Sequence, residues 1–150
     1  MRYTLQKIEF CRSTEDVSRD YIYLSDIDKI RISQLEILSS FDYQDNHGNY
    51  NCFLLISNRD IITYLAILEK NFIPHFCHDV SKVIIQNKTN LEKYLNKYLD
   101  RFNKESHIEF IEEVNMWIQQ NLNLDIILDM ISEKGIESLR PMDKEYLSKV

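Results

Sequence analysis

The chain has 150 residues, and its 18 basic and 24 acidic side chains give a formal net charge of −6. With 44% hydrophobic and 11% aromatic residues, the composition is typical of a folded globular domain and excludes a wholly disordered chain. Only two glycines and two prolines are present. This excludes collagen-like chains and enzymes that hold a phosphate group in a glycine-rich loop.

The first half of the chain is predicted to form a small antiparallel sheet. Residues 2–10 and 50–56 have the β-branched and aromatic composition of strands, and residues 21–24 form a short β-prone run. Residues 30–43 also fit a helical stripe, but the turn cluster that follows them favours a strand and a hairpin in which Gly48 takes a positive φ.

A helix and an edge strand are predicted next. Residues 57–70 have helical spacing, with Ser57 as a candidate N-cap. Residues 72–77 are a strand candidate. Because proline donates no ladder hydrogen bond, Pro74 predicts that this strand lies at an edge of the sheet or begins near the proline. Asp79 or Ser81 is then expected to cap a short helix that ends near residue 85.

The second half of the chain is predicted to be helical. Capping boxes begin at Thr89 and Ser106, a third helix begins near Asp125 and stops at Gly135, and a last helix begins near Pro141. A sheet followed by helices predicts an α+β fold. We expect one domain over residues 1–150. Its sheet-plus-helix part covers residues 1–86, and its helical part covers residues 89–150 and ends in a two-helix hairpin at 125–149.

The densest group of chemically reactive side chains is His75, Cys77 and Asp79. On a strand these three residues share one face, and imidazole, thiolate and carboxylate groups are zinc ligands, with His47 as a candidate fourth. Three successive same-face positions on one strand, however, span too far for three short bonds to one ion. The competing interpretation is that Cys77 is a buried residue, Asp79 is a helix cap and the histidines are polar residues of an edge strand. No catalytic residues are predicted.

The bulk properties favour a cytoplasmic protein. No apolar run approaches the roughly 18 residues that cross a bilayer, and no secretory signal follows Met1. Three cysteines without regular spacing make no disulfide framework. Each half of the chain has three more acidic than basic side chains, so neither half offers the basic face that nucleic acid requires. We therefore expect neither a membrane nor a nucleic-acid partner.

The segment Asp125–Leu147, DIILDMISEKGIESLRPMDKEYL, resembles a short C-terminal tail of many Bacteroidetes proteins. That tail is a helix ending in Ser-Glu-Lys-Gly, then Ser-Leu-Thr, then an acidic helix ending in Tyr-Leu or Phe-Leu. It follows the membrane domain of some rhomboid-family proteins and also occurs on small soluble proteins. The resemblance implies a helical hairpin and no catalytic residues. Arg140 replaces the usual capping Thr or Ser, and Met142 a common acid, so the last helix is expected to be less well capped.

These observations predict a non-enzymatic protein–protein interaction module. It would bind a protein partner, or a second copy as a homodimer, through an exposed sheet edge or the terminal hairpin. The apolar seam of the hairpin must pack on its own domain or on that partner. The alternative is a small metal-binding enzyme or sensor with zinc at His75, Cys77 and Asp79. No other cofactor is expected.

Overall fold

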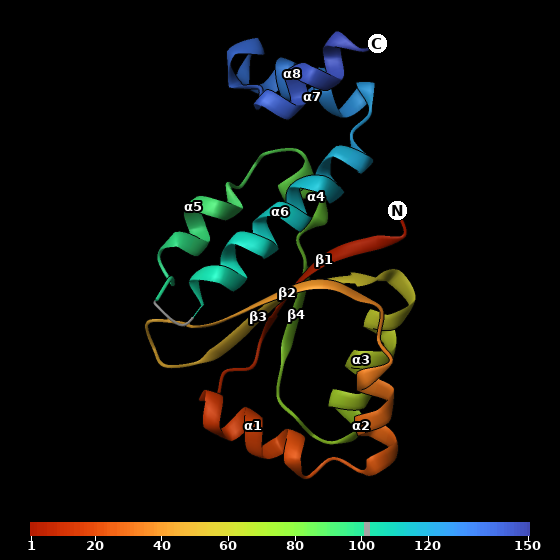
Figure 1. Cartoon of the computed structure of the whole chain (residues 1–150), viewed down its shortest axis with the longest axis vertical. Helices are drawn as coiled ribbons and strands as arrows, with labels where there is room; N and C mark the ends of the chain where they lie inside the picture. The colour runs from red at the N-terminus through yellow and green to blue at the C-terminus, as the bar shows by residue number, and fades with distance from the viewer. Residues whose placement is uncertain (101–102) are drawn as a thin grey trace.

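The computed structural model describes residues 1–100 and 103–150. A four-stranded sheet lies at the centre, with helices on both of its faces (Figure 1). The strands are β1 (Tyr3–Glu9), β2 (Ile37–Gln44), β3 (Tyr50–Ser57) and β4 (Phe76–Asp79), in the spatial order β2-β3-β1-β4. Every neighbouring pair is antiparallel. The fold is α+β, as the order of the elements predicted.

The two central strands are confirmed close to their predicted bounds. β1 pairs with β3 along its whole length, from Tyr3 opposite Ser57 to Glu9 opposite Asn51. β3 is buried on both faces, which explains its nearly continuous apolar sequence. The hairpin between β2 and β3 is also confirmed, with Gly48 at a φ of 77°.

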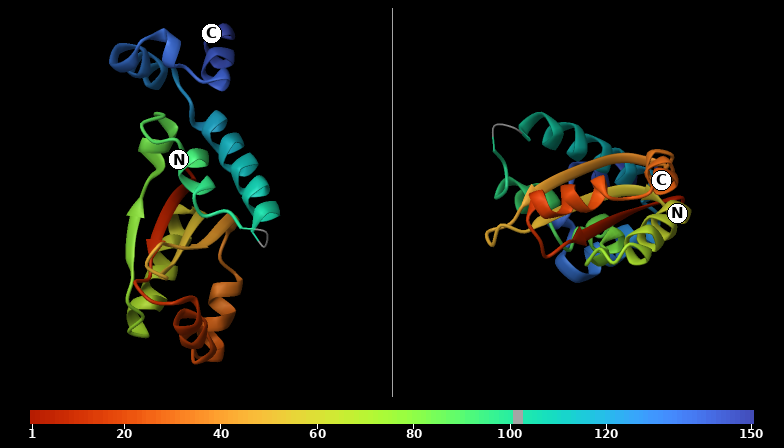
Figure 2. Two further views of the ribbon diagram at one scale, coloured as in Figure 1. Left: turned by 90° about the vertical axis from the view of Figure 1, so that its left-hand side faces the viewer. Right: turned by 90° about the horizontal axis from the view of Figure 1, so that it is seen from below.

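Helices cover each face of the sheet (Figures 1 and 2). One face packs against α1 (Thr14–Ile22), α2 (Asp26–Ser33) and α3 (Asn58–Lys70). The other packs against α4 (Ser81–Ile85), α5 (Leu91–Asn96) and α6 (Lys104–Asn121). The chain ends in α7 (Leu124–Lys134), the 3-10 turn η1 (Ile136–Ser138) and α8 (Pro141–Ser148), a segment that we call the tail hairpin. Within residues 1–100 and 103–150, no helix combines the length and the apolar character needed to cross a bilayer.

Two helices lie where a strand or a β-prone run was predicted. Residues 21–24 belong to the end of α1 and the turn after it, and residues 30–33 of the predicted strand 30–43 belong to α2, so that β2 begins only at Ile37. The hydroxyls of Ser13 and Ser25 each accept a hydrogen bond, at 3.2 Å, from the amide three residues later. These N-caps stabilise the first turns by satisfying amides that have no helical partner. They outweigh the β-propensity of the residues that follow.

Several predicted helix starts differ from the observed ones by one to three residues. Asn90, not Thr89, caps α5, and its side-chain oxygen accepts from the amide of Lys93 at 3.0 Å. Ser106 lies inside the first turn of α6, and Asn123 caps α7. A capping side chain must stand in extended backbone just before the helix, and nearby polar residues compete for that place.

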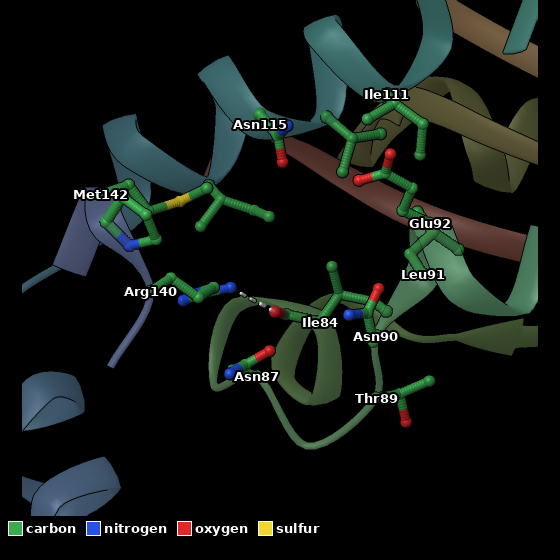
Figure 3. A pocket seen from close by; sticks show the side chains of 13 residues that line it. Ile84, Asn87, Thr89, Asn90, Leu91, Glu92, Ile111, Asn115, Arg140 and Met142 are labelled. Carbon is green, nitrogen blue, oxygen red and sulfur yellow. Dashed lines mark hydrogen bonds between the residues drawn. The ribbon is translucent and has the colours of Figure 1, made fainter. Parts of the chain in front are cut away.

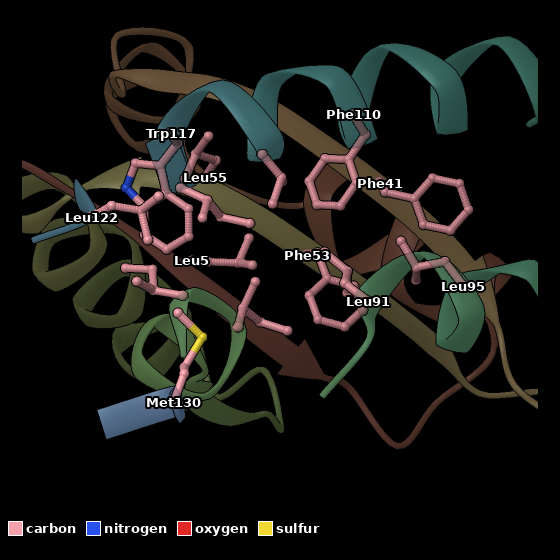
Figure 4. Close-up of a cluster of buried hydrophobic side chains, with 14 of the residues drawn as sticks. Leu5, Phe41, Phe53, Leu55, Leu91, Leu95, Phe110, Trp117, Leu122 and Met130 are labelled. Carbon is pink, nitrogen blue, oxygen red and sulfur yellow. The ribbon is translucent and has the colours of Figure 1, made fainter. Parts of the chain in front are cut away.

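The larger core lies between the sheet and α6 (Figure 4). Phe110 on α6 lies 6.0 Å from Phe41 and 6.2 Å from Phe53, measured between ring centroids. Trp117 packs in the same cluster and donates its indole N–H to the carbonyl oxygen of Tyr3 at 3.0 Å. This core continues into the tail hairpin through three buried side chains, Ile127, Met130 and Leu139. The tail hairpin therefore packs on its own chain.

Candidate functional site: the open edge of strand β4

The three predicted zinc ligands each engage a different neighbour. His75 lies just before β4, and its Nδ1 is 2.8 Å from the carbonyl oxygen of Ile73. Cys77 donates its thiol to Oε1 of Gln6 on β1 at 3.3 Å. Burial raises the pKa of Cys77 to about 11.

Asp79 and His47 are also engaged elsewhere. Asp79 accepts the amide of Ser81 at 2.9 Å, but the residue that precedes α4 is Val80, so neither Asp79 nor Ser81 is the predicted N-cap. His47 lies in the β2–β3 hairpin turn and lines a separate hollow beside Lys7. In the described part of the chain, no three His, Cys, Asp or Glu side chains gather where they could hold a metal ion. The structure thus does not assemble the predicted ligand set.

β4 presents an open edge of the sheet. It pairs with β1 on one side and is the last strand on the other, within the residues described (Figure 2). The amide of Val80 donates to the carbonyl of Leu5 at 2.9 Å. Because hydrogen-bonded positions alternate along an antiparallel pair, the backbone N–H and C=O groups of Cys77 and Asp79 point away from β1. These groups can pair with another strand.

An exposed aromatic residue, Phe72, lies four residues before this strand in the sequence. The amide of Phe72 donates to the carbonyl of Glu69 at 3.1 Å, and that of Ile73 donates to Leu68 at 3.0 Å. These two bonds close the end of α3 in the pattern that usually has glycine at the position of Phe72. Phe72 has a φ of 55°, and its exposed fraction is 92%. A bulky side chain is strained there and gains no burial.

Asp28 of α2 holds the end of α3 in place through hydrogen bonds. This buried carboxylate accepts from the ammonium of Lys70 at 2.8 Å and from the side-chain amide of Asn71 at 3.1 Å. The hydrogen bonds from Lys70 and Asn71 lower the pKa of Asp28. Phe72 follows directly after these two residues, so it projects from an anchored helix end.

A second exposed aromatic residue lies on β4 itself. Phe76 begins the strand, pairs with Glu9 of β1 and has an exposed fraction of 61%. Pro74 stands between the two phenylalanines, and the buried Ile73 holds this connection against the protein. We call Phe72, Phe76 and the outward backbone groups of Cys77 and Asp79 the β4 patch. The sequence contained a signal for it, because the predicted helix 57–70 is followed at once by an aromatic residue and a proline.

The tail hairpin, the other surface suggested by the sequence, is docked through Arg140 (Figure 3). Its guanidinium donates to the carbonyl oxygens of Ile84 at 3.1 Å and Ile85 at 2.6 Å, at the end of α4. It also makes two bonds, of 2.8 and 2.9 Å, to the fully buried carboxylate of Asp143.

The same pair also contributes to the start of α8. The side chain of Arg140 accepts no amide of the first turn, as its replacement of Thr or Ser predicted. The carboxylate of Asp143 instead accepts the backbone amide of Arg140 at 2.9 Å. The Arg-x-x-Asp spacing was the signal that could have revealed this hydrogen bond.

A cleft of about 270 Å³ lies between the tail hairpin and the rest of the protein. It mixes apolar and polar side chains from α4, α5, α6 and α8 (Figure 3). These include Ile84, Leu91, Glu92, Ile111, Asn115, Arg140 and Met142. Arg140 is already hydrogen-bonded to the carbonyls at the end of α4 and to Asp143. The cleft is therefore the place where the tail hairpin joins the rest of the chain.

Comparison with known proteins gives no match: no family model, curated protein or solved structure matches this chain. The geometry of the β4 patch is therefore the basis of the functional proposal.

Proposed function

We propose that this protein is a non-enzymatic interaction module that binds an extended segment of a partner protein along the β4 edge. The observations that support this proposal are the open edge of β4 and, four residues before that strand, Phe72, an aromatic residue that is strained and exposed. The tail hairpin, by contrast, already buries Ile127 and Leu139 against its own chain.

Strand addition uses both kinds of group in the β4 patch. The outward N–H and C=O groups of Cys77 and Asp79 supply backbone hydrogen bonds, which give affinity with little dependence on sequence. Phe72 and Phe76 supply apolar surface, and full burial of one such side chain contributes about 1.5–3 kcal/mol. Because β4 has four residues, the segment that pairs with it is short.

Charge favours a different protein over a second copy of this chain. Self-association would bring together two chains that each carry a net charge of −6, and like charges disfavour association. The partner segment we propose is extended, neutral or basic, and has apolar side chains that can cover Phe72 and Phe76. A homodimer is the other outcome of the test.

The test compares the unmodified protein with Phe76→Lys as bait in native lysate. A lysine on an edge strand discourages pairing with a further strand. Ile62→Lys on α3 is the matched control, since Ile62 is 70% exposed and lies outside the β4 patch. We expect one partner to be recovered with the unmodified protein and with Ile62→Lys, and to be lost with Phe76→Lys. Light scattering after size exclusion tests the homodimer.

Hydrogen exchange then locates the contact. The amides of Cys77 and Asp79 are expected to exchange quickly in the free protein and at least about tenfold more slowly with the purified partner. Equal recovery of every captured protein by all three baits, together with an inert monomer in solution, would overturn the proposal. So would a partner that leaves these two amides unprotected.

A further inference from the structure

A second hollow, separate from the β4 patch, lies where the β2–β3 hairpin turn meets β1 and α5. Its volume is about 260 Å³. Lys7 and Glu9 line it from β1, Tyr43 from β2, His47 from the hairpin turn, and Tyr94 and Tyr98 from α5 and the turn that follows. Nearly all of these side chains carry a polar group.

The polar groups of this hollow are held in place by one another. The ammonium of Lys7 lies 3.1 Å from the hydroxyl of Tyr94 and 3.1 Å from Oε1 of Glu9. The hydroxyl of Tyr43 lies 3.2 Å from that of Tyr94. An ammonium has three donors, so Lys7 keeps one N–H for a ligand, and Glu9 keeps its second oxygen as an acceptor.

This arrangement limits the charge of the ligand. Among the residues that the structure describes, Lys7 is the one cationic side chain that lines the hollow, and the carboxylates of Glu9 and Asp45 also face it. A phosphate or another polyanion would therefore meet net negative charge. A neutral ligand that both donates and accepts hydrogen bonds matches the neighbouring ammonium and carboxylate.

The tyrosine rings and the volume of the hollow limit the shape of the ligand. The ring centroids of Tyr43 and Tyr98 are 4.4 Å apart, so no flat molecule can enter between them. An apolar side of the ligand can therefore contact this pair of rings only from outside it. The volume is also below the roughly 300–1,000 Å³ that is typical of sites for drug-sized ligands.

We propose that this hollow binds a neutral polyhydroxyl compound of the size of one sugar ring. Two adjacent hydroxyls would bridge Lys7 and Glu9, one accepting from the ammonium and one donating to the carboxylate. The C–H face of the sugar ring would lie on Tyr98. The proposal is independent of the function assigned to the β4 patch.

The test is a titration of the ¹⁵N-labelled full chain, followed by amide chemical shifts. The probes are glucose, galactose, mannose and N-acetylglucosamine at up to about 50 mM, a range that detects millimolar affinity. Adenosine and inorganic phosphate are the comparison ligands. We expect saturable shifts in Glu9 and the hairpin turn with at least one sugar. Glu9→Gln should weaken that binding about tenfold or more, because it removes a charged hydrogen-bond acceptor.

Two further variants separate binding from folding. Lys93→Ala removes an exposed lysine of α5 that does not line the hollow, and it should bind the sugar as the unmodified protein does. Tyr98→Phe keeps the ring, so it should retain most of the affinity. Absence of saturable shifts with every sugar would overturn the proposal. Unchanged affinity in Glu9→Gln, or tighter binding of adenosine or phosphate, would do the same.

Discussion

Helices α3 and α4 end with the same hydrogen-bond pattern but with different residues. Each has a non-glycine residue with a φ of 55° just after its last turn, Phe72 for α3 and Asn87 for α4. In each, the following amide reaches back five residues, with distances of 3.0 Å for Ile73 and 2.8 Å for Lys88. Asparagine tolerates a positive φ, whereas a bulky aromatic residue does not.

The surroundings of the two helix ends also differ. The carbonyl oxygens at the end of α4 accept hydrogen bonds from Arg140, so this end is closed by the tail hairpin. The end of α3 is held by hydrogen bonds to Asp28, and the side chain of Phe72 is exposed to solvent. At the end of α4, both Asn87 and Arg140 stabilise the fold. At α3 the aromatic residue costs conformational energy and returns no burial, which supports a role for Phe72 in binding.

The largest expected effect on stability is that of Asp143→Ala, which weakens the contact between the tail hairpin and the end of α4. This change leaves Arg140 without its buried partner and removes the hydrogen bond to the backbone amide at the start of α8, and the loss of one member of a buried pair costs about 3–5 kcal/mol. Urea unfolding measures the change in the free energy of unfolding. Glu145→Ala is the control, because its pair with Lys149 is exposed and contributes about 0.5 kcal/mol. If Asp143→Ala lowered the free energy of unfolding no more than this control does, the Arg140–Asp143 pair would not be what holds the tail hairpin.

The next effect concerns the end of α3 and depends on pH. Hydrogen bonds from Lys70 and Asn71 lower the pKa of Asp28 in the folded protein. The stability that they contribute is complete above the unfolded pKa of about 4 and is lost as the pH falls through the lower folded value. Asp28→Asn should therefore be less stable than the unmodified protein at pH 7, and the difference should shrink as the pH falls from about 5 towards 2.

Chemical unfolding at a series of pH values measures this difference. Asp26→Asn, an exposed acid on the same helix, is the control and should show no comparable trend. A difference between Asp28→Asn and the unmodified protein that stays constant with pH would contradict the assigned role of Asp28.

The parts of the fold that the sequence predicted are those fixed by local pattern. The β2–β3 hairpin, the helix that begins after Ser57 and the edge position of the strand after Pro74 are all confirmed. Each depends on residues within a few positions of one another. The N-caps at Ser13 and Ser25 were equally local, but the apolar residues of α1 and α2 also fit strands, so these helices were missed.

The sequence contained a signal for the segment around Phe72 and Pro74, but the contacts that complete the candidate sites join distant residues and could not be predicted. Cys77 bonds Gln6, 71 positions away in the sequence. Arg140 bonds the carbonyls of Ile84 and Ile85, 56 and 55 positions away. Phe72 is exposed because of where α3 ends, and apolar composition alone predicts burial for such a residue.

A smaller effect, of opposite sign, is expected for Phe72→Gly. Glycine relieves about 1–2 kcal/mol of strain at a positive φ and loses about 0.4–1 kcal/mol through the greater freedom of the unfolded chain. The free energy of unfolding should therefore rise by up to about 1.6 kcal/mol, as thermal and urea unfolding can measure. Recovery of the partner in the lysate experiment should fall at the same time. A variant that is both more stable and fully able to bind would separate Phe72 from the proposed function.

The smallest effect, and the sharpest test of the comparison, is expected for Asn87→Gly. Asparagine already tolerates a positive φ, so the relief of strain is small and the entropy of the unfolded chain cancels it. The free energy of unfolding should change by about 0.5 kcal/mol or less, measured under the same conditions as for Phe72→Gly. If Asn87→Gly instead stabilised the protein as much as Phe72→Gly, phenylalanine would be no worse than asparagine at this position. The strain at Phe72 would then no longer distinguish the end of α3 from that of α4, and the proposal would rest on the open edge of β4 alone.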